Sequence, residues 1–243
     1  MNNIYSVGKP YSFTHNLQFQ QSCSPINIYA AFIGPNPVTS FIPYAYFPSI
    51  DPSSLIGPFS TIIGAVKISS NVFIGPNTSI RADEGYPFYI GKNTNLQDGV
   101  ILHGLKDERI RVKNDLYSIY IGDNVSCAHG CIVHGPCFIG DNSFIGFNSI
   151  VLNAIIEDNV YVSSDSTITN GVTVPANSFV PPGASIDTQE KANALNGVPA
   201  DKEAFAKEVI RVNTEFPKSY SILLGCHTCS CGLSCDDPLC SKL

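Results

Sequence analysis

Charged residues are scarce in this sequence, because Asp, Glu, Lys and Arg together make up only 14% of its 243 residues. Glycine and proline are abundant, with 19 and 17 copies. This balance favours a repetitive β architecture with many turns over a helical bundle. The length is sufficient for one large core and one appendage.

Other absences exclude whole classes of protein. The formal net charge is −6 and no dense Lys/Arg patch is present, which argues against a nucleic-acid-binding protein. No apolar run approaches the roughly 18 residues of a transmembrane helix. The first thirty residues lack a basic segment followed by an apolar one, so no ordinary signal peptide is predicted. We therefore expect a cytoplasmic protein by default, with a cell-surface, spore-surface or other extracellular assembly as the alternative location.

Apolar residues recur at every sixth position through the middle of the chain. The four series begin at Ile56, Ile90, Ile121 and Ile156, and the last ends at Ile186. A period of six fits neither an α-helix nor an ordinary strand, and it is typical of a parallel β-helix whose triangular coils take about 18 residues each. Small residues occupy the position four after most of these anchors, which predicts a second inward position at each corner.

The repeat divides the chain into four parts. We assign residues 51–186 to the β-helix, 1–50 to a low-charge N-terminal arm, 187–222 to a C-terminal helical segment and 223–243 to a Cys-rich tail. The arm contains one Lys and no acidic residue. It either covers the first coil or docks on a neighbouring molecule.

Interruptions of the repeat predict loops at 81–89, at 103–120 and between Val151 and Ile156. After the repeat, Thr188 is expected to cap a short helix over 189–195. An amphipathic helix is expected from Asp201 to about Phe216, ended by Pro217 and packed back along the β-helix.

Two histidines share a position in the repeat. His103 follows the anchor Leu102, and His134 follows the anchor Val133. The 31-residue spacing equals one coil plus a 13-residue insertion, so both side chains are expected to point outward from adjacent coils, about 4.8 Å apart. Imidazoles at that spacing can share one metal ion.

A third histidine, His129, lies five residues before His134. In extended chain this corresponds to about 16 Å, too far to reach the same ion within one subunit. A threefold assembly that brings His129 from a neighbouring subunit completes the set. Three histidines leave a fourth position for water, which is the arrangement of a catalytic zinc site.

Several segments resemble the gamma-class carbonic anhydrases, and most closely their carboxysomal shell-associated branch. These segments are residues 81–85 (Arg-Ala-Asp-Glu-Gly), 95–104 (Asn-Leu-Gln-Asp-Gly-Val-Ile-Leu-His-Gly), 128–129 (Ala-His) and 134–136 (His-Gly-Pro). The resemblance covers about 55–216. It implies an all-β, left-handed parallel β-helix with a C-terminal α-helix, assembled as a homotrimer that reversibly hydrates carbon dioxide to bicarbonate.

The same resemblance implies roles for individual residues. It places zinc, with ferrous iron or cobalt as alternatives, at an interface site formed by His103, His129 and His134. It further implies that Glu84 and Gln97 hydrogen-bond the metal-bound water and bicarbonate, that Asn213 lines the pocket, and that Arg81 and Asp98 form an ion pair between subunits.

The proton shuttle departs from the family pattern. The founding members carry a long acidic loop with a shuttle glutamate after the first metal histidine, whereas this chain has a shorter, basic run after Lys106-Asp107-Glu108-Arg109. Asp107 and Glu108 are the candidates for export of the proton.

The nine cysteines fall into two groups and one isolated residue. Cys127 lies on an anchor, and Cys131 and Cys137 lie on small corner positions, so all three are expected to fill the core. For the tail, disulfides between trimers, soft-metal binding and internal disulfides remain open. The candidates for intermolecular disulfides are Cys23, Cys226, Cys229, Cys231, Cys235 and Cys240. Together with the arm, they predict higher-order self-assembly.

Two other functions compete with carbonic anhydrase. A hexapeptide acyltransferase needs one catalytic histidine and a coenzyme A groove, rather than three histidines at metal-binding spacing. A scaffold or filament subunit that retains the metal-binding trimer is compatible with the arm and the tail.

Overall fold

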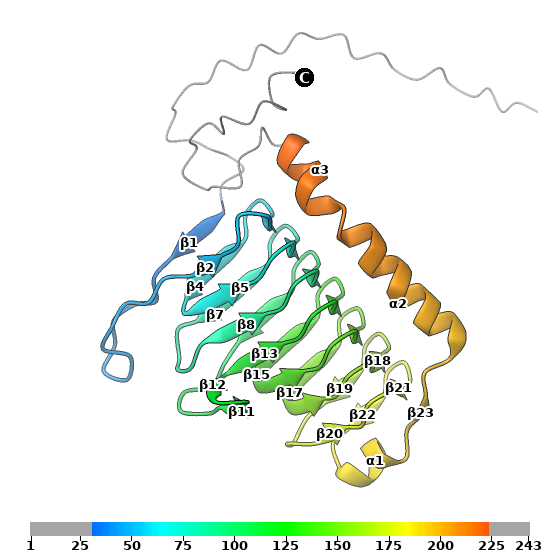
Figure 1. Cartoon of the computed structure of the whole chain (residues 1–243). Coiled ribbons are helices and arrows are strands. Elements are labelled where there is room, and N and C mark those ends of the chain that lie inside the picture. Colours follow the sequence, from blue (N-terminus) through cyan, green and yellow to red (C-terminus); the bar gives the residue numbers. More distant parts are fainter. Residues whose placement is uncertain (1–30, 224–243) are drawn as a thin grey trace, which may run out of the picture.

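The computed structural model describes residues 31–223, which form a left-handed parallel β-helix and a helical segment that runs back along it (Figure 1). Each coil is a triangle of short strands, and equivalent strands of successive coils pair in parallel. The predicted fold class is confirmed.

The coils have three faces. The first face contains β1 (Phe32–Gly34), β4 (Thr61–Gly64), β7 (Ser79–Ala82), β10 (Ile101–His103), β19 (Thr167–Ile168) and β22 (Ser185–Ile186). The second contains β2 (Ser49–Ile50), β5 (Val66–Ile68), β8 (Phe88–Ile90), β13 (Ile119–Ile121) and β20 (Thr173–Val174). The longer strands β15 (Ile132–Ile139) and β17 (Ile150–Ile156) continue from the first face onto the second.

The third face carries the two longer helices. Its strands are β3 (Leu55–Ile56), β6 (Phe73–Ile74), β9 (Asn95–Leu96), β14 (Ser126–Cys127), β16 (Phe144–Ile145), β18 (Tyr161–Val162) and β21 (Ser178–Val180). The short strand β23 (Asn196–Gly197) adds to β21 in the antiparallel direction.

The core is the column of six-residue anchors. From Ile62 to Val180 each anchor is at most 2% exposed. The small corner positions are also buried, and their hydroxyl groups link the coils: Ser60 Oγ donates to the carbonyl of Gly75 and accepts from the amide of Thr78. A hydroxyl in this position therefore satisfies backbone groups that the turn leaves without a strand partner.

Three cysteines lie in this core, as predicted. Cys127, Cys131 and Cys137 are fully buried and carry free thiols. Burial raises the pKa of Cys137 to about 12. The pKa of Cys131 is also raised, first by a hydrogen bond with Cys127 and then by burial. Such thiols remain protonated and behave as small apolar groups.

Two of the three predicted loops are present, and both leave the corner between the first and second faces. Residues 83–87 connect β7 to β8, and residues 104–118 connect β10 to β13 and contain the hairpin β11 (Ile110–Val112) and β12 (Asp115–Tyr117). The third prediction was wrong. Between Val151 and Ile156 the chain continues as β17, and β15 absorbs the one-residue difference as a bulge between His134 and Cys137.

The helices differ from the predicted ones at their ends. Helix α1 (Gln189–Asn193) is capped by Thr188 as predicted but ends before Leu195. Helix α2 (Ala200–Asn213) ends near the expected residue, and a further helix, α3 (Phe216–Leu223), follows it. The prediction that Pro217 ends a helix was wrong. Pro217 lies in the first turn of α3, where a backbone N–H would have no partner within the helix, so the lack of one costs nothing.

Both long helices pack on the third face, as predicted for the C-terminal segment. Phe205 of α2 meets the ring of Phe144 edge-on, and Phe216 and Tyr220 of α3 pack on Phe73. None of the helices in residues 31–223 is long and apolar enough to cross a membrane.

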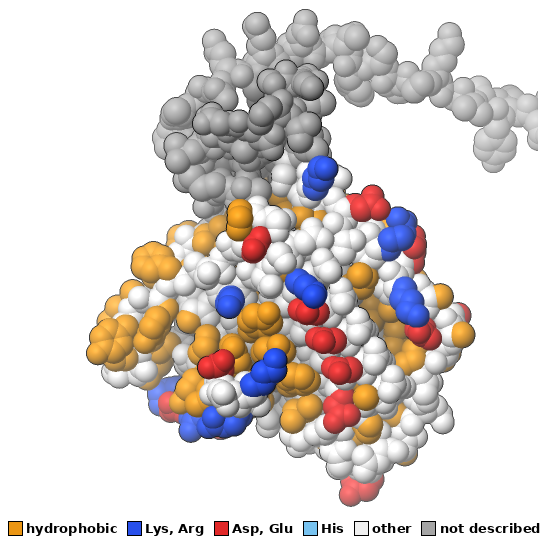
Figure 2. All heavy atoms as spheres, viewed as in Figure 1, with side chains coloured by type: hydrophobic (Ala, Val, Ile, Leu, Met, Phe, Trp, Pro, Cys, Tyr) orange, Lys and Arg blue, Asp and Glu red, His pale blue; other side chains and the backbone are white. Residues whose placement is uncertain are grey.

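The described end of the N-terminal arm forms the first coil. Strands β1 and β2 pair with β4 and β5, and residues 35–48 project between them as a loop. Hydrophobic side chains gather on this projection (Figure 2), and we call residues 35–48 the aromatic loop.

Candidate metal centre

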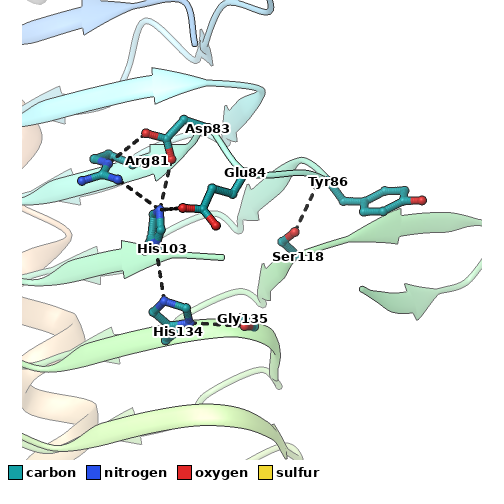
Figure 3. Close-up of polar contacts among 8 residues, drawn as sticks. All are labelled: Arg81, Asp83, Glu84, Tyr86, His103, Ser118, His134 and Gly135. Carbon is teal, nitrogen blue, oxygen red and sulfur yellow. Dashed lines mark hydrogen bonds and ion pairs between the residues drawn. The ribbon is translucent and has the colours of Figure 1, made fainter. Parts of the chain in front are cut away.

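His103 and His134 lie side by side on the first face, as their spacing predicts. His103 is the last residue of β10 and is the register partner of His134 in β15. Their rings point toward each other (Figure 3). His103 Nδ1 lies 3.2 Å from His134 Nε2. Both rings are partly buried.

This pair fits a shared zinc ion. Two nitrogens bound at 2.0–2.1 Å to a tetrahedral zinc are about 3.3 Å apart. The observed separation of 3.2 Å is close to that value, and neutral imidazole is a preferred zinc ligand. The residues present therefore fit the metal that the family resemblance implies.

Charged side chains surround the other nitrogen of His103. Asp83 Oδ1 lies 3.1 Å from His103 Nε2, and Asp83 Oδ2 accepts from Arg81 Nε at 3.0 Å. With its proton on Nε2, His103 donates to Asp83 and directs the lone pair of Nδ1 toward His134. Glu84 Oε1 is 3.6 Å from the same Nε2, so its carboxylate lies beside the histidine pair.

Sequence reasoning missed Asp83, although its spacing contains a signal. It lies two residues after Arg81, at the start of an interruption of the repeat, next to the predicted Glu84. Loops that interrupt a solenoid commonly carry functional side chains.

His129 lies at the opposite end of the first face, at the corner with the third face. Its Nδ1 is 3.4 Å from Asp98 Oδ2. Its ring stacks on Phe147, with centroids 5.7 Å apart and planes 11° apart. Asp98 orients one nitrogen and Phe147 covers one side of the ring, which leaves Nε2 available to a ligand. Phe147, one coil further along the chain, was also missed.

Gln97 and Asn213 lie on the side of His129. Both line a hollow of about 400 Å³ between the third face and the helices, together with Asp98, His129 and Phe147. Gln97 Nε2 donates to Asn95, and Asn213 Nδ2 donates to the carbonyl of Val209. These bonds fix both amides at the edge of the hollow.

The predicted site residues therefore lie in two separate clusters of one chain, which we call the half-sites. His103, His134, Arg81 and Glu84 lie at one corner, and His129, Asp98, Gln97 and Asn213 at the other. Arg81 and Asp98 do not pair with each other in the chain; they contact Asp83 and His129 instead. Within residues 31–223 no group of three His, Cys, Asp or Glu side chains is placed to hold a metal ion.

The surface between the half-sites is apolar. Ile101, Ile132 and Ile150 are register neighbours on the first face, and Ile101 points outward on the same strand as His103. Ile101 and Ile150 are among the most exposed large apolar residues of the β-helix. A continuous apolar strip beside polar groups is typical of a surface that contacts another protein.

The two shuttle candidates lie in the loop after His103. Asp107 is exposed and pairs with Lys106, and Glu108 is exposed nearby. A Cβ atom on Gly85 would lie 3.5 Å from the carbonyl of Leu105 and 3.7 Å from the amide of Asp107, so this loop passes directly beside the residue that follows Glu84. The predicted disulfide candidates Cys23, Cys226, Cys229, Cys231, Cys235 and Cys240 lie outside the described residues.

Comparisons with known proteins identify relatives of this chain. The chain is 37% identical over 198 residues to a carbonic anhydrase of Methanosarcina thermophila, which covers 76% of this chain and 79% of that protein. It is 43% identical over 172 residues to the carboxysome assembly protein CcmM of Nostoc sp., covering 70% of this chain but only 31% of the relative. The chain thus matches about a third or less of the carboxysome proteins' length.

Solved structures show the same fold. A hexapeptide transferase family protein from Anaplasma phagocytophilum superposes with a TM-score of 0.58 at 23% identity, over 72% of this chain and 93% of that one. No family model matches the chain. On the strength of the sequence relatives, the chain belongs to the gamma-class carbonic anhydrase family, as the motifs indicated.

Proposed function

We propose that this protein is a zinc-dependent carbonic anhydrase whose active sites form between the subunits of a homotrimer. The observation that carries the proposal is the distance of 3.2 Å between His103 Nδ1 and His134 Nε2, which fits two ligands of one zinc ion. His129 of a neighbouring subunit supplies the third ligand. The apolar strip between the two half-sites supports burial of this face in the trimer.

Zinc held by His103, His134 and a neighbouring subunit's His129 would supply Lewis acidity, which lowers the pKa of water to about 7. Ferrous iron and cobalt suit the same imidazole ligands. The reaction also requires that a proton leave the site and that the product be held there.

The chain's own side chains meet these needs. Glu84, beside His103 and partly exposed, accepts a hydrogen bond from water at the site and holds its proton transiently. Gln97 uses one N–H for Asn95, which leaves its second N–H and its carbonyl oxygen for bicarbonate. Asn213 Nδ2 uses one N–H for the carbonyl of Val209, which leaves its second N–H and its Oδ1 for the pocket. Asp107 or Glu108 then passes the proton from Glu84 to solvent.

Replacing one ligand tests this proposal. His134→Ala should abolish zinc binding and carbon dioxide hydration while the trimer persists, because the β-helix core is untouched. Leu152→Ala is the matched control, since Leu152 is the register partner of His134 on the next coil and lies outside the proposed ligand set. Full zinc content in His134→Ala, measured by elemental analysis of purified trimer, would refute the site.

A scaffold or filament subunit is the second candidate. It is favoured by the 43% identity to a carboxysome assembly protein, which exceeds the 37% identity to the carbonic anhydrase. In this role the trimer retains its metal but organises other molecules. A zinc-loaded trimer without hydration activity, with every His ligand occupied, would favour this candidate over the enzyme.

A further inference from the structure

The aromatic loop is an ordered projection with an apolar surface. Asn36 is buried at its base, where Nδ2 donates to the carbonyl of Tyr44 and Oδ1 accepts from the amide of Tyr46. Its sequence, residues 35–48, contains no charged residue. Tyr44 and Phe47 are 67% and 69% exposed. Large apolar side chains fixed in this way on a surface mark a contact with another protein.

The loop lies at the corner that carries the histidine pair. It leaves the β-helix between the first and second faces, as do loops 83–87 and 104–118. Lys106 Nζ is 5.9 Å from the centre of the Phe41 ring, which places the aromatic loop against the loop that follows His103. The loop therefore projects beside the half-site that lacks its third histidine.

The partner that must reach this corner is a second copy of the chain. His129 and His134 are five residues apart along one stretch of coil, so they lie at nearly the same height on the β-helix. A rotation about an axis parallel to the β-helix leaves the position of each residue along that axis unchanged. Such a rotation can therefore bring His129 of a neighbouring subunit to His134. Each coil then faces the same coil of the next subunit.

An exposed aromatic residue at the matching level also lies at the edge that carries His129. The aromatic loop belongs to the first coil, and that coil ends at the corner containing Phe59, which is 59% exposed. Phe59 and His129 lie on the same edge, between the third and first faces. This edge is the one that approaches the histidine pair of the neighbour.

We propose that the aromatic loop of each subunit packs on Phe59 of its neighbour and clamps the two half-sites together. The inference rests on the proposed trimer and adds to it a specific contact. Aromatic anchors in a desolvated contact commonly dominate the affinity of an interface.

The first test measures assembly. The double variant Tyr44→Ser/Phe47→Ser should raise the midpoint concentration for trimer formation about tenfold or more, by analytical ultracentrifugation of the full chain. Phe59→Ser should raise the midpoint concentration by a similar factor. The triple variant Tyr44→Ser/Phe47→Ser/Phe59→Ser should raise it little further, because both sets of substitutions remove the same contact. Ile155→Ser is the control, because Ile155 is a similarly apolar, partly exposed residue on the second face. Unchanged midpoints, or fully additive effects, would overturn the contact.

A second test does not depend on stability. A photo-crosslinking amino acid in place of Tyr44 should join two chains, and mass spectrometry should find the adduct on the peptide that contains Phe59. Adducts within one chain, on another surface, or with a different protein would contradict the proposal, as would the absence of any adduct.

These results separate the clamp from the metal site. A trimer that depends on the loop but holds no zinc retains the clamp and refutes the proposed active site. A zinc-loaded, active trimer that tolerates both sets of substitutions refutes the clamp alone.

Discussion

Asp83 should control how tightly the site holds zinc, although it is not a ligand. Its carboxylate is largely buried and bridges Arg81 Nε at 3.0 Å and His103 Nε2 at 3.1 Å. One oxygen fixes the ring of His103, and the other neutralises a guanidinium whose Nη2 lies 3.2 Å from the same ring nitrogen. Removing the carboxylate leaves Arg81 as a cation against a metal ligand.

The magnitude follows from these contacts. Loss of an outer-shell partner of a metal-bound histidine typically costs about 10- to 100-fold in metal affinity. Asp83→Asn keeps an oxygen that accepts from His103 but loses the charge, so we expect a loss of about 10-fold. Asp83→Ala loses both the hydrogen-bond acceptor and the charge, so we expect its zinc affinity to fall about 100-fold.

Competition with a chromophoric zinc chelator measures the affinity of each variant. Asp115→Asn is the control, because Asp115 is an exposed carboxylate in the hairpin of β11 and β12. At saturating zinc the Asp83 variants should regain most of their hydration rate. If Asp83→Ala binds zinc as tightly as the unmodified chain, the role of this carboxylate is incorrect.

Three further predictions concern other parts of the account. Glu84→Ala should lower the hydration rate at unchanged zinc content, whereas zinc loss comparable to that of a histidine variant would make Glu84 a ligand. Phe147→Ala should weaken zinc binding about 5-fold, because a stacked aromatic pair contributes about 1 kcal/mol to fixing the ring of His129. Phe147→Tyr should retain the affinity, and equal zinc affinities for the unmodified chain and both variants would show that Phe147 does not support the site. Tyr120 stacks on Tyr89 and should ionise near pH 12 in an ultraviolet titration, because burial and then Tyr89 raise its pKa from 10 to about 12. Since the folded state holds this proton more tightly, the resulting stability is complete below pH 10 and is lost as the pH rises toward 12. A Tyr120 that titrates at pH 10 would show that it is not packed on Tyr89.

The fold was predictable because one physical constraint repeats. Each coil has to place a branched apolar side chain on the same inward column, so the spacing from Ile62 to Ile80 defines the period directly. The same arithmetic placed His103 beside His134 across a long insertion. The β-helix absorbs insertions at its corners without shifting the register of the strands that follow.

What the sequence could not supply depends on local three-dimensional contacts. The bulge beside His134 offsets a missing residue on the next coil, and no periodicity distinguishes this from a loop. Pro217 ends a helix or begins one equally well by propensity, and the packing of Phe216 on Phe73 selects the second. Asp83 and Phe147 act through contacts with a neighbouring coil, which a repeat pattern leaves open.

A mixing experiment tests the central claim, that the zinc ligands come from two subunits, most directly. Trimers of His129→Ala retain the histidine pair, and trimers of His134→Ala retain the third ligand, so neither alone contains an intact site. Unfolding and reassembling equal amounts of the two chains should restore zinc and hydration to about one quarter of the wild-type level, because each mixed trimer of a cyclic threefold assembly regains one site. No recovery after co-assembly is verified by native mass spectrometry would contradict the interface site.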